Sequence, residues 1–231
     1  EELLAWAVLQ AQNGRGDAAA VFDRAMKLAG DTPSVDVLLT YHRLLWKQER
    51  WLQVADVCDD LLAQMPAGDD RRGAVLQSRA GSLLRLYRGD PKADGVFRER
   101  LTKAMAAVFD GPLPAPTRQE ALMQWTDLQM QKGPSRDIGR VLQAHESLVQ
   151  NQAYLLYSLA LCQQSALSAP TADADTRSAS AKEVQEVLST LRAAQEAAAR
   201  AGDRPLLARA VLVQAQLLAG PEIRDKQAAL R

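Results

Sequence analysis

The side chains that could perform chemistry are few and widely separated along the 231-residue chain. Its two histidines, His42 and His145, and its two cysteines, Cys58 and Cys162, show none of the short spacings that gather a metal ion. All four fall on or beside apolar positions that recur with the period of a helix. We therefore expect packed, structural histidines and buried free thiols.

Other signatures of catalysis or cofactor binding are missing from the sequence. It contains no phosphate-binding glycine loop, no dinucleotide-binding glycine motif and no nucleophile elbow. Asp173 and Asp175 alternate with alanine, but they lack the glycine and the terminal glutamate of a calcium loop. No carboxylate pair is accompanied by an apolar pattern that would raise its pKa for acid–base work. We therefore predict a protein that is not an enzyme and that carries neither a metal ion nor a cofactor.

Composition favours helices and argues against two classes of partner. Aromatic residues make up only 5% of the chain, whereas sheets prefer aromatic and β-branched residues. The 28 basic and 28 acidic residues cancel, so no nucleic-acid partner is expected. No apolar run approaches the roughly 20 residues of a membrane span. Residues 49–70 are acid-rich and residues 71–103 are base-rich, which indicates a solvated helix face or, alternatively, a charge gradient along the surface.

Evenly spaced breaks divide the chain into pairs of helices. Turn-forming residues recur at 30–33 and 48–51, and Pro66 closes the helix that follows the second break. Between these breaks the apolar residues repeat at the spacing of one helix face. The helix–turn–helix units recur at a period of about 34 residues, which is a spacing typical of helical repeat proteins.

The unit over residues 35–68 is the clearest, and it resembles the tetratricopeptide repeat superfamily. The residues that carry the resemblance are Leu38, Tyr41, His42 and Leu45 in the first helix and Val54, Cys58, Leu61 and Pro66 in the second. His42 stands where the family usually has a small residue and Leu61 where it usually has alanine, so the repeat is degenerate. The resemblance implies an all-α solenoid, a right-handed superhelix of about eleven helices whose first helices line a concave groove.

The remaining breaks predict the organisation of the whole chain. We expect three helix pairs in residues 1–110, a Pro-rich joint at 111–116, a further pair plus one helix in 117–167, a mobile polar loop at 168–180, and a last pair with a truncated helix in 181–231. Asp90 and Pro91 are expected to start the second helix of the third pair, with Val96 on its apolar stripe. Thr117 and Glu120 predict a capping box, and the apolar stripe over 138–149 predicts one continuous helix.

Two of the four tryptophans have two interpretations. Trp46 falls near the end of a first helix and Trp51 falls in the turn that follows it. They either fill the wedge between the second and third repeats or anchor a partner, because tryptophan is enriched at interface hot spots. Trp6 and Trp125 are expected in the core.

The resemblance also selects residues that would face the groove. In the family, fixed positions of each first helix project into it, and we predict partner-binding residues at Leu39, Arg43, Trp46, Lys47, Arg79, Arg85, Met123, Asp127 and Gln131. The first half of this groove is basic and aromatic, so an extended peptide or a helix with an acidic segment is the expected ligand. Family members that clamp a C-terminal carboxylate use asparagine, and Asn13 and Asn151 do not occupy such positions.

These observations favour a non-catalytic scaffold that binds a protein or peptide partner. The chain begins Glu1-Glu2 without a methionine, so we expect a piece of a longer protein and predict neither a location nor an oligomeric state. In bacteria such arrays commonly serve envelope, secretion or export machinery, and that setting is suggested by analogy alone. The alternative is a ligand-sensing or regulatory solenoid that controls an attached effector domain.

Overall fold

The structure, a computed structural model, describes Trp6, Leu9 and residues 20–24, 33–89, 95–168 and 181–219. Within these residues it contains the helices α3 to α12, further helical residues at 6, 9 and 20–24, and no strand, which confirms the predicted all-α class. The chain divides into two compact units, Glu1–Pro114 and Ala115–Arg231. The predicted polar loop at 168–180 lies outside the described residues except for its first residue, and so does the predicted truncated helix after Ala219.

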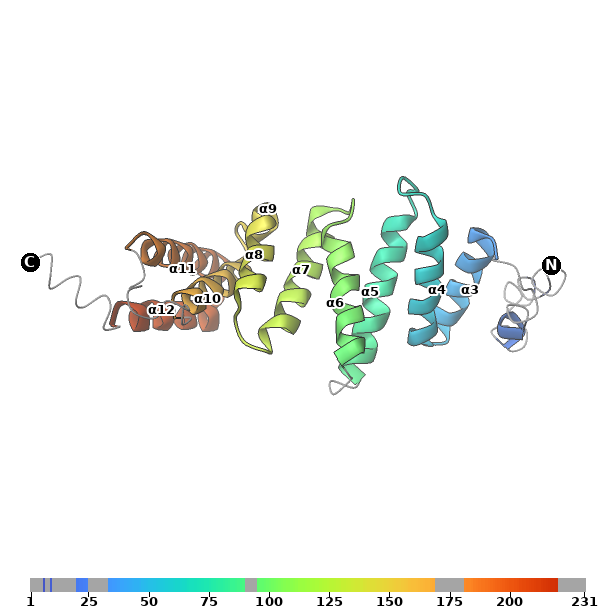
Figure 1. Cartoon of the computed structure of the whole chain (residues 1–231), viewed down its shortest axis with the longest axis horizontal. Helices are drawn as coiled ribbons and strands as arrows, with labels where there is room; N and C mark the ends of the chain where they lie inside the picture. The colour runs from blue at the N-terminus through green and yellow to red at the C-terminus, as the bar shows by residue number, and fades with distance from the viewer. Residues whose placement is uncertain are drawn as a thin grey trace, which may run out of the picture. The chain divides into compact units, whose positions relative to one another are not determined.

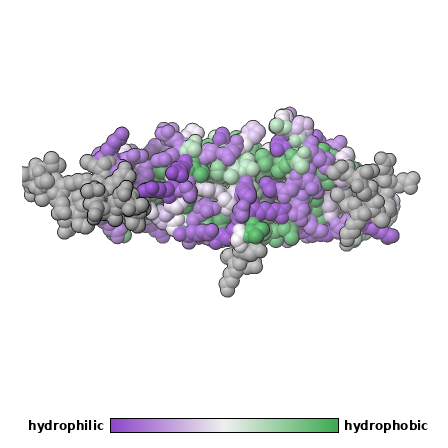
Figure 2. Space-filling view, in the orientation of Figure 1, coloured by the Kyte–Doolittle hydropathy of each residue, from purple (hydrophilic) through white to green (hydrophobic). Residues whose placement is uncertain are grey.

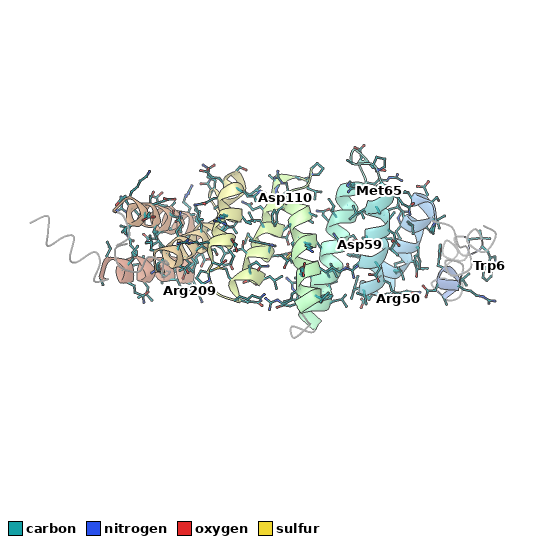
Figure 3. The ribbon with its side chains drawn as sticks, in the orientation of Figure 1. Trp6, Arg50, Asp59, Met65, Asp110 and Arg209 are labelled. Atoms are coloured by element: carbon teal, nitrogen blue, oxygen red, sulfur yellow. The ribbon has the colours of Figure 1, made fainter. Side chains whose placement is uncertain are left out.

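Helices α3 to α6 of the first unit follow one another, and each packs against the next (Figure 1). They are α3 (Val35–Lys47), α4 (Trp51–Gln64), α5 (Arg72–Gly89) and α6 (Gly95–Phe109). Glu49 adopts a left-handed backbone conformation, with φ of 58°, in the turn between α3 and α4. Met65 is extended at the end of α4 because it precedes Pro66, so the predicted closure of this helix is confirmed. Figure 3 marks Arg50 and Met65 at the two ends of α4.

The predicted apolar faces of α3 and α4 form the core of the first unit. The residues that bury their side chains there are Leu38, Tyr41, Leu45, Val54, Cys58 and Leu61. Fully burying a leucine side chain stabilises a fold by about 1.5–3 kcal/mol, so these positions hold the two helices together. The hydroxyl of Tyr41 donates to Asp23, which also accepts from Arg50 at 2.8 Å and so ties the turn after α3 to the preceding segment.

The acid-rich and base-rich stretches meet across neighbouring helices. Arg100 of α6 donates to Asp56 and to Asp59 of α4, each at 2.7 Å. Nε of Arg79 on α5 lies 2.6 Å from Oδ1 of Asp59, at an angle that makes an ion pair without a hydrogen bond. Figure 2 shows hydrophilic side chains over α4 and α5, where Figure 3 labels Asp59. We refer to these ion pairs among α4, α5 and α6 as the ladder. Each partly exposed pair contributes only about 0.2–1 kcal/mol to stability, so the ladder mainly aligns the helices.

One apolar position of α6 was wrongly predicted. Val96 is 76% exposed, whereas the buried stripe of this helix consists of Leu101, Ala104, Met105, Val108 and Phe109. At 3.6 residues per turn Val96 lies about 140° around the helix axis from Leu101, so it faces away from the stripe. The predicted helix start at Asp90 and Pro91 lies outside the described residues.

The second unit is arranged around α10. Its helices are α7 (Ala115–Met130), α8 (Arg136–Ala144), α9 (Glu146–Val149), α10 (Ala153–Ser168), α11 (Ala181–Ala201) and α12 (Arg204–Ala219). Helix α10 contacts α7, α8, α11 and α12. Trp125 is buried in this unit, as predicted, whereas Trp6 in the first unit is 49% exposed, so its assignment to the core is wrong.

Two helix boundaries in the second unit also differ from the predictions. Helix α7 begins at Ala115, so Thr117 lies inside its first turn and cannot form the capping box with Glu120. Pro116 is accepted there because the first amides of a helix need no partner within it. The stripe predicted as one helix over 138–149 is two helices, because His145 leaves the helical conformation with φ of −110° and ψ of 36°.

Candidate functional site

A groove of about 550 Å³ lies between α3 and α5 of the first unit. Helix α3 contributes residues from two adjacent rows, and α5 contributes small and polar residues at helical spacing. The lining residues are His42, Arg43, Trp46, Lys47, Ala74, Gln77, Ser78, Gly81 and Arg85. We refer to this hollow as the α3–α5 groove.

Two tryptophan rings form a corner beside the groove, and an arginine occupies it. The ring centroids of Trp46 and Trp51 lie 5.1 Å apart at 81°, which is an edge-to-face arrangement. The guanidinium carbon of Arg85 lies 4.9 Å from the centroid of Trp46 and 5.0 Å from that of Trp51. Both distances allow a cation–π attraction. Nη1 of Arg85 also donates to the carbonyl oxygen of Gly81 at 3.2 Å.

Both tryptophan rings are half-buried and pack against the hydrophobic core of the first unit. Trp46 also lines the groove. The two interpretations of these residues are therefore compatible in space, since a ring can pack against the core with one side and present the other to the groove.

His42 links the two walls of the groove. Its Nε2 lies 2.6 Å from Oγ of Ser78 on α5, and its ring lies 6.0 Å from that of Trp46. Burial lowers the pKa of His42 below its usual 6.5, and the positive charge of Arg43 lowers it further. His42 is therefore neutral at pH 7 and serves as a hydrogen-bonded structural residue.

All of the charged side chains that line the groove are basic. They are Arg43, Lys47 and Arg85. Arg43 and Lys47 lie four residues apart, on one face of α3, and both are exposed. Within the described part of the chain no carboxylate pairs with either of them. The neighbouring acids Asp56 and Asp59 are instead engaged by Arg79 and Arg100, in the ladder on α4 to α6.

The structure brings four of the nine predicted partner-binding residues together. Arg43, Trp46, Lys47 and Arg85 line the groove. Leu39 lies on the same helix, but it packs against the core. Arg79 is held by Asp59 in the ladder and does not line the groove.

The other three predicted residues belong to the second unit. Met123 and Asp127 lie on α7, where Asp127 accepts a hydrogen bond from the Tyr154 hydroxyl at 3.3 Å. Gln131 follows the end of that helix.

Some groove residues were not among the predicted sites. Gln77, Ser78 and Gly81 line the groove from α5, and His42 had been assigned a structural role only. The signal was present, because Arg85, Gly81, Ser78 and Ala74 follow the spacing of one helix face. The repeat register of this helix was not fixed by the sequence, so this face could not be identified as the one that lines the groove.

The second unit has a hollow of opposite charge. A groove of about 410 Å³ lies among α8, α9, α10 and α11, and its charged lining residues are Glu146 and Glu186. The second unit therefore serves as an internal control, because a ligand that is attracted to the basic groove of the first unit should not be attracted to this acidic one.

The described residues offer no metal site, and their cysteines are not activated. No group of three or more histidine, cysteine, aspartate or glutamate side chains gathers within the described ranges. Cys58 and Cys162 are free and buried, as predicted. Burial raises the pKa of Cys58 to about 12 and also raises that of Cys162, so neither forms a thiolate nucleophile at neutral pH. None of the helices described is both long and apolar enough to span a membrane.

Comparisons of the chain with models of known protein families, with characterised proteins and with solved structures give no match.

Proposed function

We propose that this chain is a non-catalytic interaction scaffold that binds an acidic segment of a partner protein in the α3–α5 groove. The observation that carries the proposal is the charge of the groove: three basic side chains line it and no acidic one does. A peptide with glutamate or aspartate side chains complements such a surface.

The separation of charges within the first unit supports this assignment. Asp56 and Asp59 on α4 are satisfied by arginines from α5 and α6. Arg43 and Lys47 on α3 have no such partner among the described residues, and both are exposed at the groove. Their positive charge is therefore available to attract an acidic ligand, in a manner that salt will screen.

The partner segment also needs apolar side chains. The groove is lined by Trp46 and Ala74 and by the aliphatic parts of its long basic side chains. Buried aromatic anchors with a polar surround are the usual source of affinity at protein interfaces. An extended strand or a helix that alternates acidic and apolar residues would satisfy both properties.

The tetratricopeptide resemblance supports the same surface. The groove lies between α3 and α5, which the proposed repeat register assigns as the first helices of successive units. In a solenoid of that family the first helices line the concave, ligand-binding face. The solenoid, the family membership and the peptide-binding role belong together in this proposal.

The experiment is a binding titration by fluorescence anisotropy with a short, labelled, C-terminally amidated peptide in which leucine and glutamate alternate. The matched control peptide carries glutamine in place of glutamate. We expect the acidic peptide to bind more tightly, and we expect added salt to weaken it.

Variants locate the binding surface. Neutralising Arg43 and Lys47 together, as Arg43→Gln with Lys47→Gln, should weaken the acidic peptide about five- to tenfold. The control pair Lys132→Gln with Arg140→Gln removes the same charge from the second unit and should change little. Equal binding of the two peptides, or an equal loss in the control pair, would contradict the proposal.

A further inference from the structure

We infer that Arg85 is the residue that recognises a side-chain carboxylate of the bound segment, and that Trp46 and Trp51 hold it in place for this contact. The inference rests on the proposed function, because it names the group that reads the acidic ligand in the α3–α5 groove.

The geometry fixes the arginine head group. The guanidinium lies in the corner between two nearly perpendicular indole rings, about equally far from both centroids. Its Nη1 donates to the carbonyl oxygen of Gly81, one turn earlier on α5. The head group is thus restrained by two rings and one hydrogen bond, although the side chain is exposed.

The restraint leaves donors for a ligand. A guanidinium carries five N–H groups, and stacking on one aromatic ring leaves them free because it uses a face of the planar group. Since the two rings are nearly perpendicular, the planar group can stack on only one of them, and the other ring lies towards its edge. One N–H is used by Gly81. Arg85 lines the groove, so its remaining donors are accessible from there.

The three cations of the groove differ in how well they are ordered. No ring or carboxylate of the described residues restrains Arg43 or Lys47, and both must lose side-chain freedom when they bind a ligand. Arg85 is already ordered, since its tryptophan walls pack against the core. A preorganised donor loses less freedom on binding and sets the position of the ligand, while flexible cations mainly supply attraction.

A carboxylate is the group that suits this arrangement. Its two oxygens lie in one plane and match two parallel N–H donors of a guanidinium. Lysine cannot reproduce this fork, because an ammonium is a point charge with rotating donors. The recognised carboxylate belongs to a glutamate or aspartate side chain within the segment. A C-terminal carboxylate and a phosphoryl group are the alternatives that the experiment separates.

The test uses the amidated leucine–glutamate peptide and the substitution Arg85→Lys, which keeps the charge and removes the fork. Arg85 is exposed, so the variant should fold like the parent. We expect binding to weaken by about tenfold or more. Parent-like binding by Arg85→Lys, together with weakening by Arg43→Gln and Lys47→Gln, would overturn this inference and leave the proposed function standing. Absence of binding to the parent protein would overturn both.

The tryptophan walls are tested by Trp51→Leu and Trp51→Phe. We expect Trp51→Leu to weaken the acidic peptide but not the glutamine peptide, and Trp51→Phe to restore most of the loss, because phenylalanine keeps an aromatic face. Equal binding of the acidic peptide by both variants would show that the ring does not position Arg85. If Trp51→Leu unfolds, the comparison of Arg85→Lys with the parent still tests whether the Arg85 guanidinium recognises the carboxylate.

Two further peptides identify the recognised group. The first has phosphoserine in place of glutamate, and the second has glutamine side chains with a free C-terminal carboxylate. We expect both to bind more weakly than the amidated leucine–glutamate peptide. Tighter binding of either would overturn the assignment of a side-chain carboxylate.

Discussion

A Cβ atom added to Gly81 would lie 3.3 Å from Nη1 of Arg85. The absent side chain of one residue therefore makes room for the head group of the other, one turn further along α5. The same pair is joined by the hydrogen bond from Arg85 to the Gly81 carbonyl oxygen. Glycine is unfavourable within a helix, so its presence here accords with a requirement other than stability.

Gly81→Ala should separate stability from binding. Alanine is the better helix former, so we expect the free energy of unfolding to rise by about 0.5–1 kcal/mol. The added methyl group must displace the Arg85 head group by a few tenths of an ångström, so we expect the acidic peptide to bind roughly threefold more weakly. Chemical denaturation and anisotropy titration measure the two effects.

The control for this substitution is Gly95→Ala in α6, where the added Cβ would meet nothing within 4 Å. It should leave peptide binding unchanged. Parent-like binding by Gly81→Ala would show that the position of Arg85 does not depend on Gly81.

His42 should make the first unit sensitive to acid. The pKa of His42 in the folded state lies below the usual 6.5 of the unfolded chain. Between these two pKa values the folded protein therefore binds fewer protons than the unfolded chain. Its contribution is therefore present above pH 6.5 and is lost as the pH falls towards the folded-state pKa. We expect this loss in the parent and not in His42→Gln, when the free energy of unfolding is measured from pH 7.5 down to pH 5.

His145→Gln is the matched control, since it removes the other histidine, which lies in the second unit. The comparison assigns to His42 only the pH dependence that His42→Gln removes and His145→Gln retains. A parent and a His42→Gln variant with parallel profiles would mean that His42 has the same pKa in both states.

Among the described glycines of the first unit, Gly111 should be the one that least tolerates a side chain. An added Cβ would lie 2.8 Å from the carbonyl oxygen of Ala107 and 3.3 Å from Cδ1 of Leu76. A backbone carbonyl at the end of α6 cannot move aside as a side chain can, so we expect Gly111→Ala to destabilise the unit by about 1–3 kcal/mol. Gly68→Ala, where the Cβ meets no atom within 4 Å, should change stability by less than about 0.5 kcal/mol. Similar denaturation midpoints for the two variants would refute this difference.

The apolar pattern was sufficient for α3 and α4 but not for their neighbours. Leu38, Leu45 and Leu61 could be placed in the core because turns on both sides fix the register of their helices. Helix α5 has a weaker pattern, and its groove face carries small and polar residues that no hydrophobic stripe reveals. For this reason the prediction missed the residues around Arg85 on α5, although it placed Arg85 itself at the groove.

Other differences between the predictions and the structure have a common cause: a residue can satisfy a local rule while its contacts with neighbouring residues decide where it lies. Arg79 has the charge of a groove residue, but Asp59 on the adjacent helix holds it elsewhere. Thr117 has the side chain of a helix cap, but the helix had already begun at Ala115. Contacts between helices of this kind are not visible in the spacing of a single segment.

The most direct measurement is an NMR titration of the indole N–H groups of the four tryptophans with the amidated leucine–glutamate peptide. Trp46 and Trp51 flank Arg85 in the first unit, while Trp125 is buried in the second. We expect the signals of Trp46 and Trp51 to shift together with one dissociation constant, and the signal of Trp125 to stay in place. Unchanged signals from Trp46 and Trp51 at saturating peptide, or an equal shift of Trp125, would contradict binding in the α3–α5 groove.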